Sequence, residues 1–164
     1  MFNLKLSQML VLFLLVFPLT LSAQDKSFVI RGLTKKADII LTGKVSQKIS
    51  TWNENKTRIF TRAKLQVGDF LKGSKKGSSV EVVYPGGEVG DVGEIYSHMP
   101  KFAENEEVLV FLKKDVKKNA YRVLNGEEGK FSVTDDSETE NQMIRSTQMI
   151  KELKEQIRKF VNEQ

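Results

Sequence analysis

A strict alternation of side-chain character over residues 59–67 constrains the fold of this chain more than any other feature of its sequence. Because successive side chains of a strand point to opposite faces, a period of two predicts a β-strand with one buried face. The chain therefore contains at least one strand that needs a partner layer. The inward phase holds Ile59, Thr61, Ala63, Leu65 and Val67, and the outward phase holds Arg62, Lys64 and Gln66.

Comparable strand patterns recur along the chain and are separated by turn signals. Residues 39–45 are apolar on both faces in their first half, and "VEVVY" (80–84) and "EVLVFL" (107–112) have strand length and composition. "AYRVLNG" and "GKFSV" are expected to pair as two strands joined through residues 126–129. Five or six strands without crossover helices predict a mainly β protein, with an antiparallel sheet closed into a small barrel.

Two helices are expected at the ends of this barrel. Ser27 is a good capping residue for a short N-terminal helix that continues to Ala37. Near the C-terminus, apolar residues recur at helical spacing from Ser137 to Phe160, with lysines and glutamates on the other face. This amphipathic helix is expected to pack on the barrel, since balanced Lys and Glu disfavour the alternative of a helix lying on a membrane. Its apolar residues are Met143, Ile150, Leu153, Ile157 and Phe160.

The first 23 residues have the layout of a secretory signal peptide. A start with one charge, Lys5, precedes an apolar run over residues 9–17 and a small-residue end, for which we expect cleavage after Ala23. The protein is then exported to a periplasm or the exterior, without stable membrane insertion after cleavage. The alternative is that the leader is retained as an anchor. No cysteine follows Ala23, so the fold is held without disulfides.

Removing this leader leaves 141 of the 164 residues, which is ordinary for one domain. We expect the barrel domain over residues 24–136 and the amphipathic helix over residues 137–164. After the leader, 25 basic residues stand against 21 acidic ones, and the two kinds are interleaved. Nucleic-acid binding calls for a dense basic stripe with aromatic residues between, so no nucleic-acid partner is expected.

Several motifs in this order resemble those of a family of uncharacterised bacterial exported proteins. They are "KKADIILTGKV", the long alternating strand followed by "FLKG", then "VEVVYPGG", "ENEEVLVFLKK" and "AYRVLNGEEGKFSV". They are more distantly similar to the netrin-like domain of the tissue inhibitors of metalloproteinases, which implies an OB-type five-stranded barrel. In those inhibitors an N-terminal cysteine contacts the zinc of the protease. This chain has no cysteine, so that inhibitory mechanism is not carried over.

Residues 85–100 concentrate glycines, carboxylates and the only histidine of the chain, which raises the question of chemistry. A phosphate-binding loop needs a following helix and often a lysine, and neither follows here. A metal site would use Glu88, Asp91, Glu94 and His98, but a glycine at every third position gives little rigidity to hold ligands. No cysteine or G-x-S-x-G elbow supplies a nucleophile. We therefore expect no cofactor and no enzyme, and the alternative is a metal-dependent or hydrolytic enzyme built on this segment.

The same segment is the best candidate for a recognition surface. Glycines permit turns and close approach of the backbone, so a ribbon of turns or a bulged hairpin at the rim of the barrel is expected. OB-type barrels bind ligands with such loops and the neighbouring sheet face. We expect an exported, non-enzymatic binding module whose partner is another exported or envelope protein, and an inhibitor-like role without the cysteine-based mechanism is one form of this function. Core covering by the aromatic residues is the competing interpretation. The expected contacts are Tyr84, Tyr96, His98, Met99 and Phe102.

Overall fold

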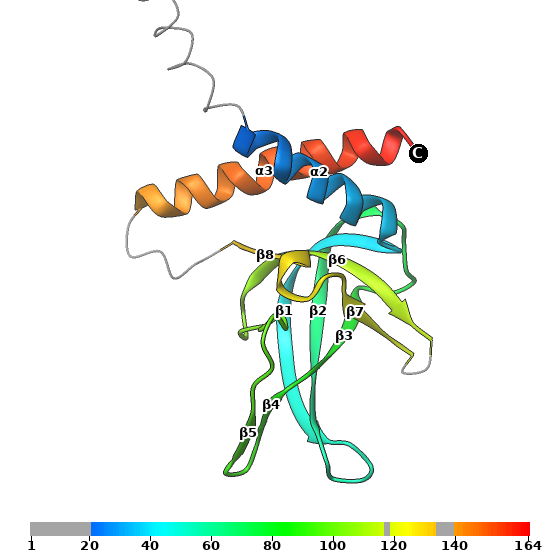
Figure 1. Ribbon diagram of the computed structural model, residues 1–164, viewed down its shortest axis with the longest axis vertical. Helices are drawn as coiled ribbons and strands as arrows, with labels where there is room; N and C mark the ends of the chain where they lie inside the picture. Colours follow the sequence, from blue (N-terminus) through cyan, green and yellow to red (C-terminus); the bar gives the residue numbers. More distant parts are fainter. Residues whose placement is uncertain (1–20, 117–118, 134–139) are drawn as a thin grey trace, which may run out of the picture.

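The computed structural model describes residues 21–116, 119–133 and 140–164, and it is mainly β. Two helices, α2 (Leu21–Lys36) and α3 (Glu140–Asn162), lie together across one end of the sheet (Figure 1). A 3₁₀ turn, η2, covers Gly126–Gly129. The strands are β1 (Ile39–Trp52), β2 (Ile59–Lys72), β3 (Ser79–Pro85), β4 (Gly87–Val89), β5 (Val92–Glu94), β6 (Glu107–Asp115), β7 (Ala120–Val123) and β8 (Lys130–Val133).

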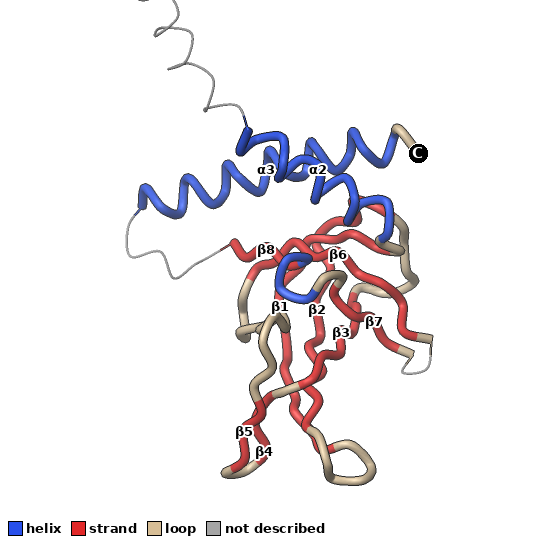
Figure 2. Tube along the Cα trace, in the orientation of Figure 1, coloured by secondary structure: helices blue, strands red, loops and turns tan. Residues whose placement is uncertain are grey.

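Six of the strands form one sheet in the order β1-β2-β3-β7-β6-β8, and β1 also pairs with β6. The pairings therefore run from β1 through β2, β3, β7 and β6 and return to β1. The β1–β2 hairpin is the longest element, and its far end extends away from the helices beside the separate β4–β5 hairpin (Figure 2). The β4–β5 part of the glycine-rich segment thus lies at the end of the molecule opposite the helices, whereas His98 lies beside η2 (Figure 2).

Buried side chains form two clusters, one on each face of β1 and β6. Alternation assigns Leu41 and Val110 to the inner cluster, together with Leu65 of β2, and all three are fully buried. Ile40 and Phe111 belong to the second cluster, which lies under the helices. The expectation that residues 39–45 begin as a strand buried on both faces is confirmed, as is the inward phase of β2. Helix α3 adds Ile150, Leu153, Ile157 and Phe160 to the second cluster.

The structure differs from the sequence expectation in the pairing of its last strands. We expected residues 120–126 and 129–133 to form a hairpin, but β7 and β8 both pair with β6 and not with each other. The chain leaves the edge of β6 after Val123, makes the turn η2, and returns to the same strand at Lys130. The sheet is also not wholly antiparallel, because β3 and β7 pair in parallel.

The helices differ from the expectation in where they begin. Helix α2 begins at Leu21, so Ser27 lies inside it and does not cap its start. Most of the expected signal peptide, the first residues of the expected C-terminal helix (137–139) and the side chain of Met143 lie outside the described residues. The last four apolar positions of the C-terminal helix all face the sheet or α2, as their spacing predicts.

Candidate functional site

The glycine-rich segment crosses the inner face of the β1–β2 hairpin. After β3, Gly86 donates its N–H to the carbonyl of Ile59 at 2.8 Å, and the chain then forms the β4–β5 hairpin. Gly87 has a φ of 125°, and a Cβ at this position would overlap with the hydroxyls of Ser50 and Thr61. Only glycine therefore allows the backbone to come this close to β1 and β2.

A chain of hydrogen bonds fixes this crossing. The hydroxyl of Thr61 donates to the carbonyl of Gly86 at 2.6 Å and is hydrogen-bonded to the hydroxyl of Ser50 at 2.8 Å. Glu94 accepts at one carboxylate oxygen from the N–H of Ile59 at 2.9 Å and from the hydroxyl of Tyr96 at 3.0 Å. The hydrogen bond to Glu94 raises the pKa of Tyr96, which stays a protonated donor at neutral pH.

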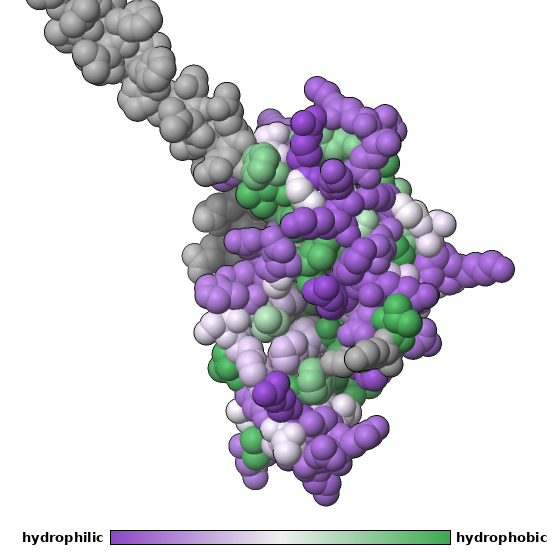
Figure 3. Space-filling model, turned by 45° about the vertical axis from the view of Figure 1, so that its right-hand side comes forward, coloured by the Kyte–Doolittle hydropathy of each residue, from purple (hydrophilic) through white to green (hydrophobic). Residues whose placement is uncertain are grey.

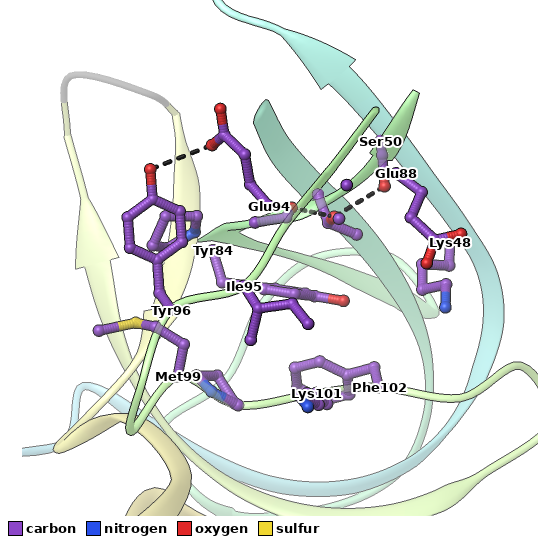
Figure 4. Close-up of a pocket in the computed structure, with 16 residues that line it drawn as sticks. Lys48, Ser50, Tyr84, Glu88, Glu94, Ile95, Tyr96, Met99, Lys101 and Phe102 are labelled. Atoms are coloured by element: carbon purple, nitrogen blue, oxygen red, sulfur yellow. Dashed lines mark hydrogen bonds between the residues drawn. The ribbon is translucent and has the colours of Figure 1, made fainter. Parts of the chain in front are cut away.

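The segment and the hairpin beneath it enclose an open pocket of about 530 Å³. Lys48 and Ser50 project from β1 on one side of it, and Tyr96 and Met99 lie on the other (Figure 4). This volume is within the range of ligand pockets, about 300–1,000 Å³. The other lining residues are Thr61, Tyr84, Pro85, Gly86, Gly87, Glu88, Gly93, Glu94, Ile95, Pro100, Lys101 and Phe102.

An aromatic pair forms the base of the pocket. The rings of Tyr84 and Phe102 lie 5.5 Å apart and both belong to the inner cluster. Burial raises the pKa of Tyr84. Beside this pair, the ammonium of Lys130 lies 5.1 Å from the ring centre of Phe102 and 2.6 Å from a carboxylate oxygen of Glu106. The base is therefore a rigid, well-packed surface.

Four of the five expected contact residues line this pocket, in two different roles. Tyr84 and Phe102 are buried at its base, whereas Tyr96 and Met99 are half-buried on its wall. His98 does not line it. The His98 side chain is 84% exposed and its Nδ1 lies 3.2 Å from a carboxylate oxygen of Glu127.

The four candidate metal ligands do not come together. Glu94 accepts hydrogen bonds from Ile59 and Tyr96, and His98 faces Glu127. Glu88 lies on the β4–β5 hairpin and Asp91 lies in its turn. In the part of the chain that the structure describes, no three His, Cys, Asp or Glu side chains lie close enough together to hold a metal ion.

Sequence reasoning did not select the residues that β1 and β2 contribute to the pocket. Thr61 carried a usable signal, because it is the one hydroxyl residue in an otherwise apolar inward phase. Lys48 and Ser50 carried none, since they lie in a polar stretch and reach the pocket only through the register of β1 against β2. Ile95, whose exposed fraction is 83%, lies inside the segment that was selected, and Lys101 follows that segment directly.

The face of the molecule drawn in Figure 3 is largely hydrophilic, with small separated apolar patches. Neither of the described helices is long and apolar enough to cross a membrane.

Comparison with known proteins finds no family model that matches the chain and no matching curated protein.

Proposed function

We propose that this chain is an exported, non-enzymatic binding module that recognises another exported or envelope protein through the pocket between β1 and residues 95–102. One observation carries the proposal. Four residues that the sequence marked for recognition line a single open pocket, and a buried aromatic pair and a hydrogen-bonded crossing hold its base. A rigid base with half-buried aromatic and methionine side chains on the wall is the composition that protein interfaces favour.

We further propose that the sheet is an OB-like barrel, as the resemblance to the netrin-like domain implies. Support comes from the strand pairings, because each of β1, β2, β3, β7 and β6 pairs with two others and the series returns to β1. In such barrels ligands bind to loops and to the adjoining sheet face. The pocket is built from one long loop segment and the inner face of β1 and β2.

The geometry of the hydroxyl groups supports binding without catalysis. The hydroxyls of Ser50 and Thr61 are hydrogen-bonded to each other and to a carbonyl, and the ring of His98 lies beside Glu127 and does not line the pocket. A serine nucleophile needs a base within hydrogen-bond reach. The alternative, a metal-dependent or hydrolytic enzyme, would need His98 to turn toward the pocket.

A capture experiment with paired variants tests the proposed function. The purified protein is immobilised and exposed to envelope extract and culture fluid of the source cell, alongside the double variant Tyr96→Ala/Met99→Ala and the variant His98→Ala. We expect one partner to be retained by the wild type and by His98→Ala and lost with the double variant, mainly through faster dissociation. Identical capture by all three proteins would contradict the proposal.

A melting experiment separates the enzyme alternative from the binding module. A metal that binds only the folded state raises the melting temperature by mass action. We expect divalent metals to leave the melting temperature unchanged. A rise that disappears in His98→Ala would favour the metal-dependent enzyme. The intact mass of the exported protein tests the leader, since cleavage after Ala23 leaves a chain that begins at Gln24.

A further inference from the structure

The outer edge of β1 has a strand partner over only the first half of the strand. β1 pairs with β2 over nearly its whole length, but its other edge pairs with β6 only from Ile39 to Lys44. Val45 then exchanges backbone hydrogen bonds with Glu106 and Asn105, at 2.9 and 2.8 Å. Beyond Val45, no strand within the described ranges pairs with this edge.

The backbone groups of the unpaired edge point outward in a regular pattern. Ile59 accepts a hydrogen bond from Gly86 and donates one to Glu94, so its backbone groups face away from β1. Trp52, its cross-strand partner, therefore faces away from β2. By alternation along the strand, Ser50 and Lys48 also present their N–H and C=O groups at the open edge. An unpaired edge of this kind is a template for another strand.

The unpaired edge adjoins the pocket. Lys48 and Ser50, two of the three outward-facing residues, also line it, with Tyr96 and Met99 across from them (Figure 4). Side chains of neighbouring strands share a face, so a strand added to β1 would direct every second side chain into the pocket. Backbone pairing would then supply affinity, and the pocket would supply selectivity.

The charges at the rim indicate which side chains such a strand carries. Lys48 and Lys101 have no acidic partner among the described residues, and Glu94 already accepts two hydrogen bonds. Glu88 is the exposed carboxylate of the pocket lining. The lining therefore carries two ammonium groups, those of Lys48 and Lys101, and one carboxylate without a hydrogen bond described above. A second copy of this chain would bring a further positive charge, its own Lys48, to the rim. An acidic residue in the added strand would instead neutralise the excess positive charge of the lining.

We infer that residues 48–52 of β1 form a strand-addition site, at which an extended segment of the partner protein pairs with β1 and places an apolar side chain and, two residues away, an acidic one on the side of the pocket. This inference rests on the proposed function and specifies how the partner is held. The segment needs free N–H groups at alternate positions, because Lys48, Ser50 and Trp52 offer both donors and acceptors.

Backbone blocking in the ligand tests the inference directly. Short random peptides are selected on the purified protein, and the best binder is resynthesised with a single N-methyl group at each position in turn. Because N-methylation removes one donor, we expect about tenfold weaker binding at every second residue and little change at the residues between. Sensitivity without a period of two, or failure to select any peptide, would overturn the strand-addition site and leave the capture experiment to judge the proposed function.

Paired variants of Lys48 test the protein side. Lys48→Pro removes an outward N–H next to the bulge of β1, a position where proline is tolerated, and Lys48→Ala removes the charge but keeps the N–H. We expect Lys48→Pro to bind the selected peptide about tenfold more weakly than Lys48→Ala. Equal binding by two folded variants would overturn the inference, and if Lys48→Pro does not fold the N-methyl series decides alone.

Two further results separate the possible occupants. If Tyr96→Ala/Met99→Ala abolished peptide binding while Lys48→Pro and N-methylation had no effect, the pocket would be the binding site and the strand-addition site would be overturned. A dimer of the purified protein that dissociates in Lys48→Pro would identify the occupant as a second copy and overturn the partner segment.

Discussion

Thr61 is the polar member of the buried face of β2, and its hydroxyl has a structural role there. It donates to the carbonyl of Gly86 and is hydrogen-bonded to the hydroxyl of Ser50, so this buried hydroxyl has partners. Leaving such a group unpaired costs about 1–3 kcal/mol. The hydrogen bonds form only if the crossing chain comes very close, and this explains the glycines at 86 and 87.

Replacing Gly87 by Ala is expected to lower the free energy of unfolding by about 2–4 kcal/mol, from backbone strain and steric overlap together. The added methyl would meet the hydroxyls of Ser50 and Thr61, at a φ of 125°. Gly90→Ala is the matched control, because Gly90 has a φ of 59° and nothing within 4 Å of an added Cβ. Gly90→Ala is expected to lower the free energy of unfolding by about 1 kcal/mol. Urea melts of both variants measure the difference, and equal losses would contradict the close crossing.

Glu106 is expected to make stability depend on pH. Burial raises its pKa, but hydrogen bonds from Lys130, Ser132 and the N–H of Ala103 outweigh it, so the pKa lies below its ordinary value of 4.5. A carboxylate with a depressed pKa stabilises the fold above that ordinary value, and the contribution is lost as the pH falls through the folded pKa.

The variant Glu106→Gln isolates this contribution. At neutral pH it is expected to lose about 1–3 kcal/mol, because the ammonium of Lys130 keeps no charged partner. Denaturant melts from about pH 7 to about pH 3 should show the gap between wild type and variant narrowing as the carboxylate is protonated. The exposed neighbour Glu104, changed to Gln, is the control with little expected effect. A gap that does not change with pH would count against the ion pair.

Sequence reasoning reached residues that belong to a pattern and missed those defined by register. Tyr84, Tyr96, Met99 and Phe102 were found because they flank glycines in one continuous segment. His98 belongs to the same segment, yet it has a φ of 59° and its ring faces Glu127, outside the pocket lining. Lys48 and Ser50 come from a strand whose pairing with β2 includes a bulge, and a local pattern does not contain that information.

Among the elements, α3 shows how far periodicity alone can be trusted. Its apolar spacing predicted the buried face, and the structure places that face against α2, β2 and β8. The expected hairpin of β7 and β8 was wrong for a physical reason. The pattern of two short strands with glycines between them is the same for a hairpin and for one strand interrupted by the turn η2. Only pairing with β6 distinguishes the two.

Truncation of Ile157 tests the packing of α3 on the sheet. Ile157 is fully buried in the second cluster, so Ile157→Ala is expected to lower the free energy of unfolding by about 2–5 kcal/mol. Met149 lies on the same helix with 49% of its surface exposed, and Met149→Ala is expected to stay within about 0.5 kcal/mol of wild type. Chemical denaturation followed by circular dichroism measures both. A neutral Ile157→Ala would mean that the helix does not pack as described.

On the scale of the whole molecule, β1 and β6 connect the two clusters of buried side chains. Each strand directs alternate residues into the inner cluster and into the cluster under the helices, so neither cluster can open without disturbing the same backbone. The β4–β5 hairpin, which contributes to the pocket, lies at the end of the molecule away from the helices (Figure 1). Loss of packing in one cluster is therefore expected to lower the stability of the other as well.

Leu65→Ala tests this coupling, because Leu65 lies in the inner cluster and does not belong to the cluster under the helices. We expect a loss of about 2–5 kcal/mol, the usual range for a buried leucine. Fluorescence of Trp52, the single tryptophan, reports the far end of the β1–β2 hairpin, and helical circular dichroism reports α2 and α3.

In a two-state protein both signals give one transition, and the substitution shifts the two curves equally. Val116→Ala is the control, since Val116 is 82% exposed and is expected to shift neither curve by more than about 0.5 kcal/mol. If Leu65→Ala moved the Trp52 curve and left the helical curve in place, the two clusters would unfold separately. The pocket would then be attached to a sheet that opens independently of its helices.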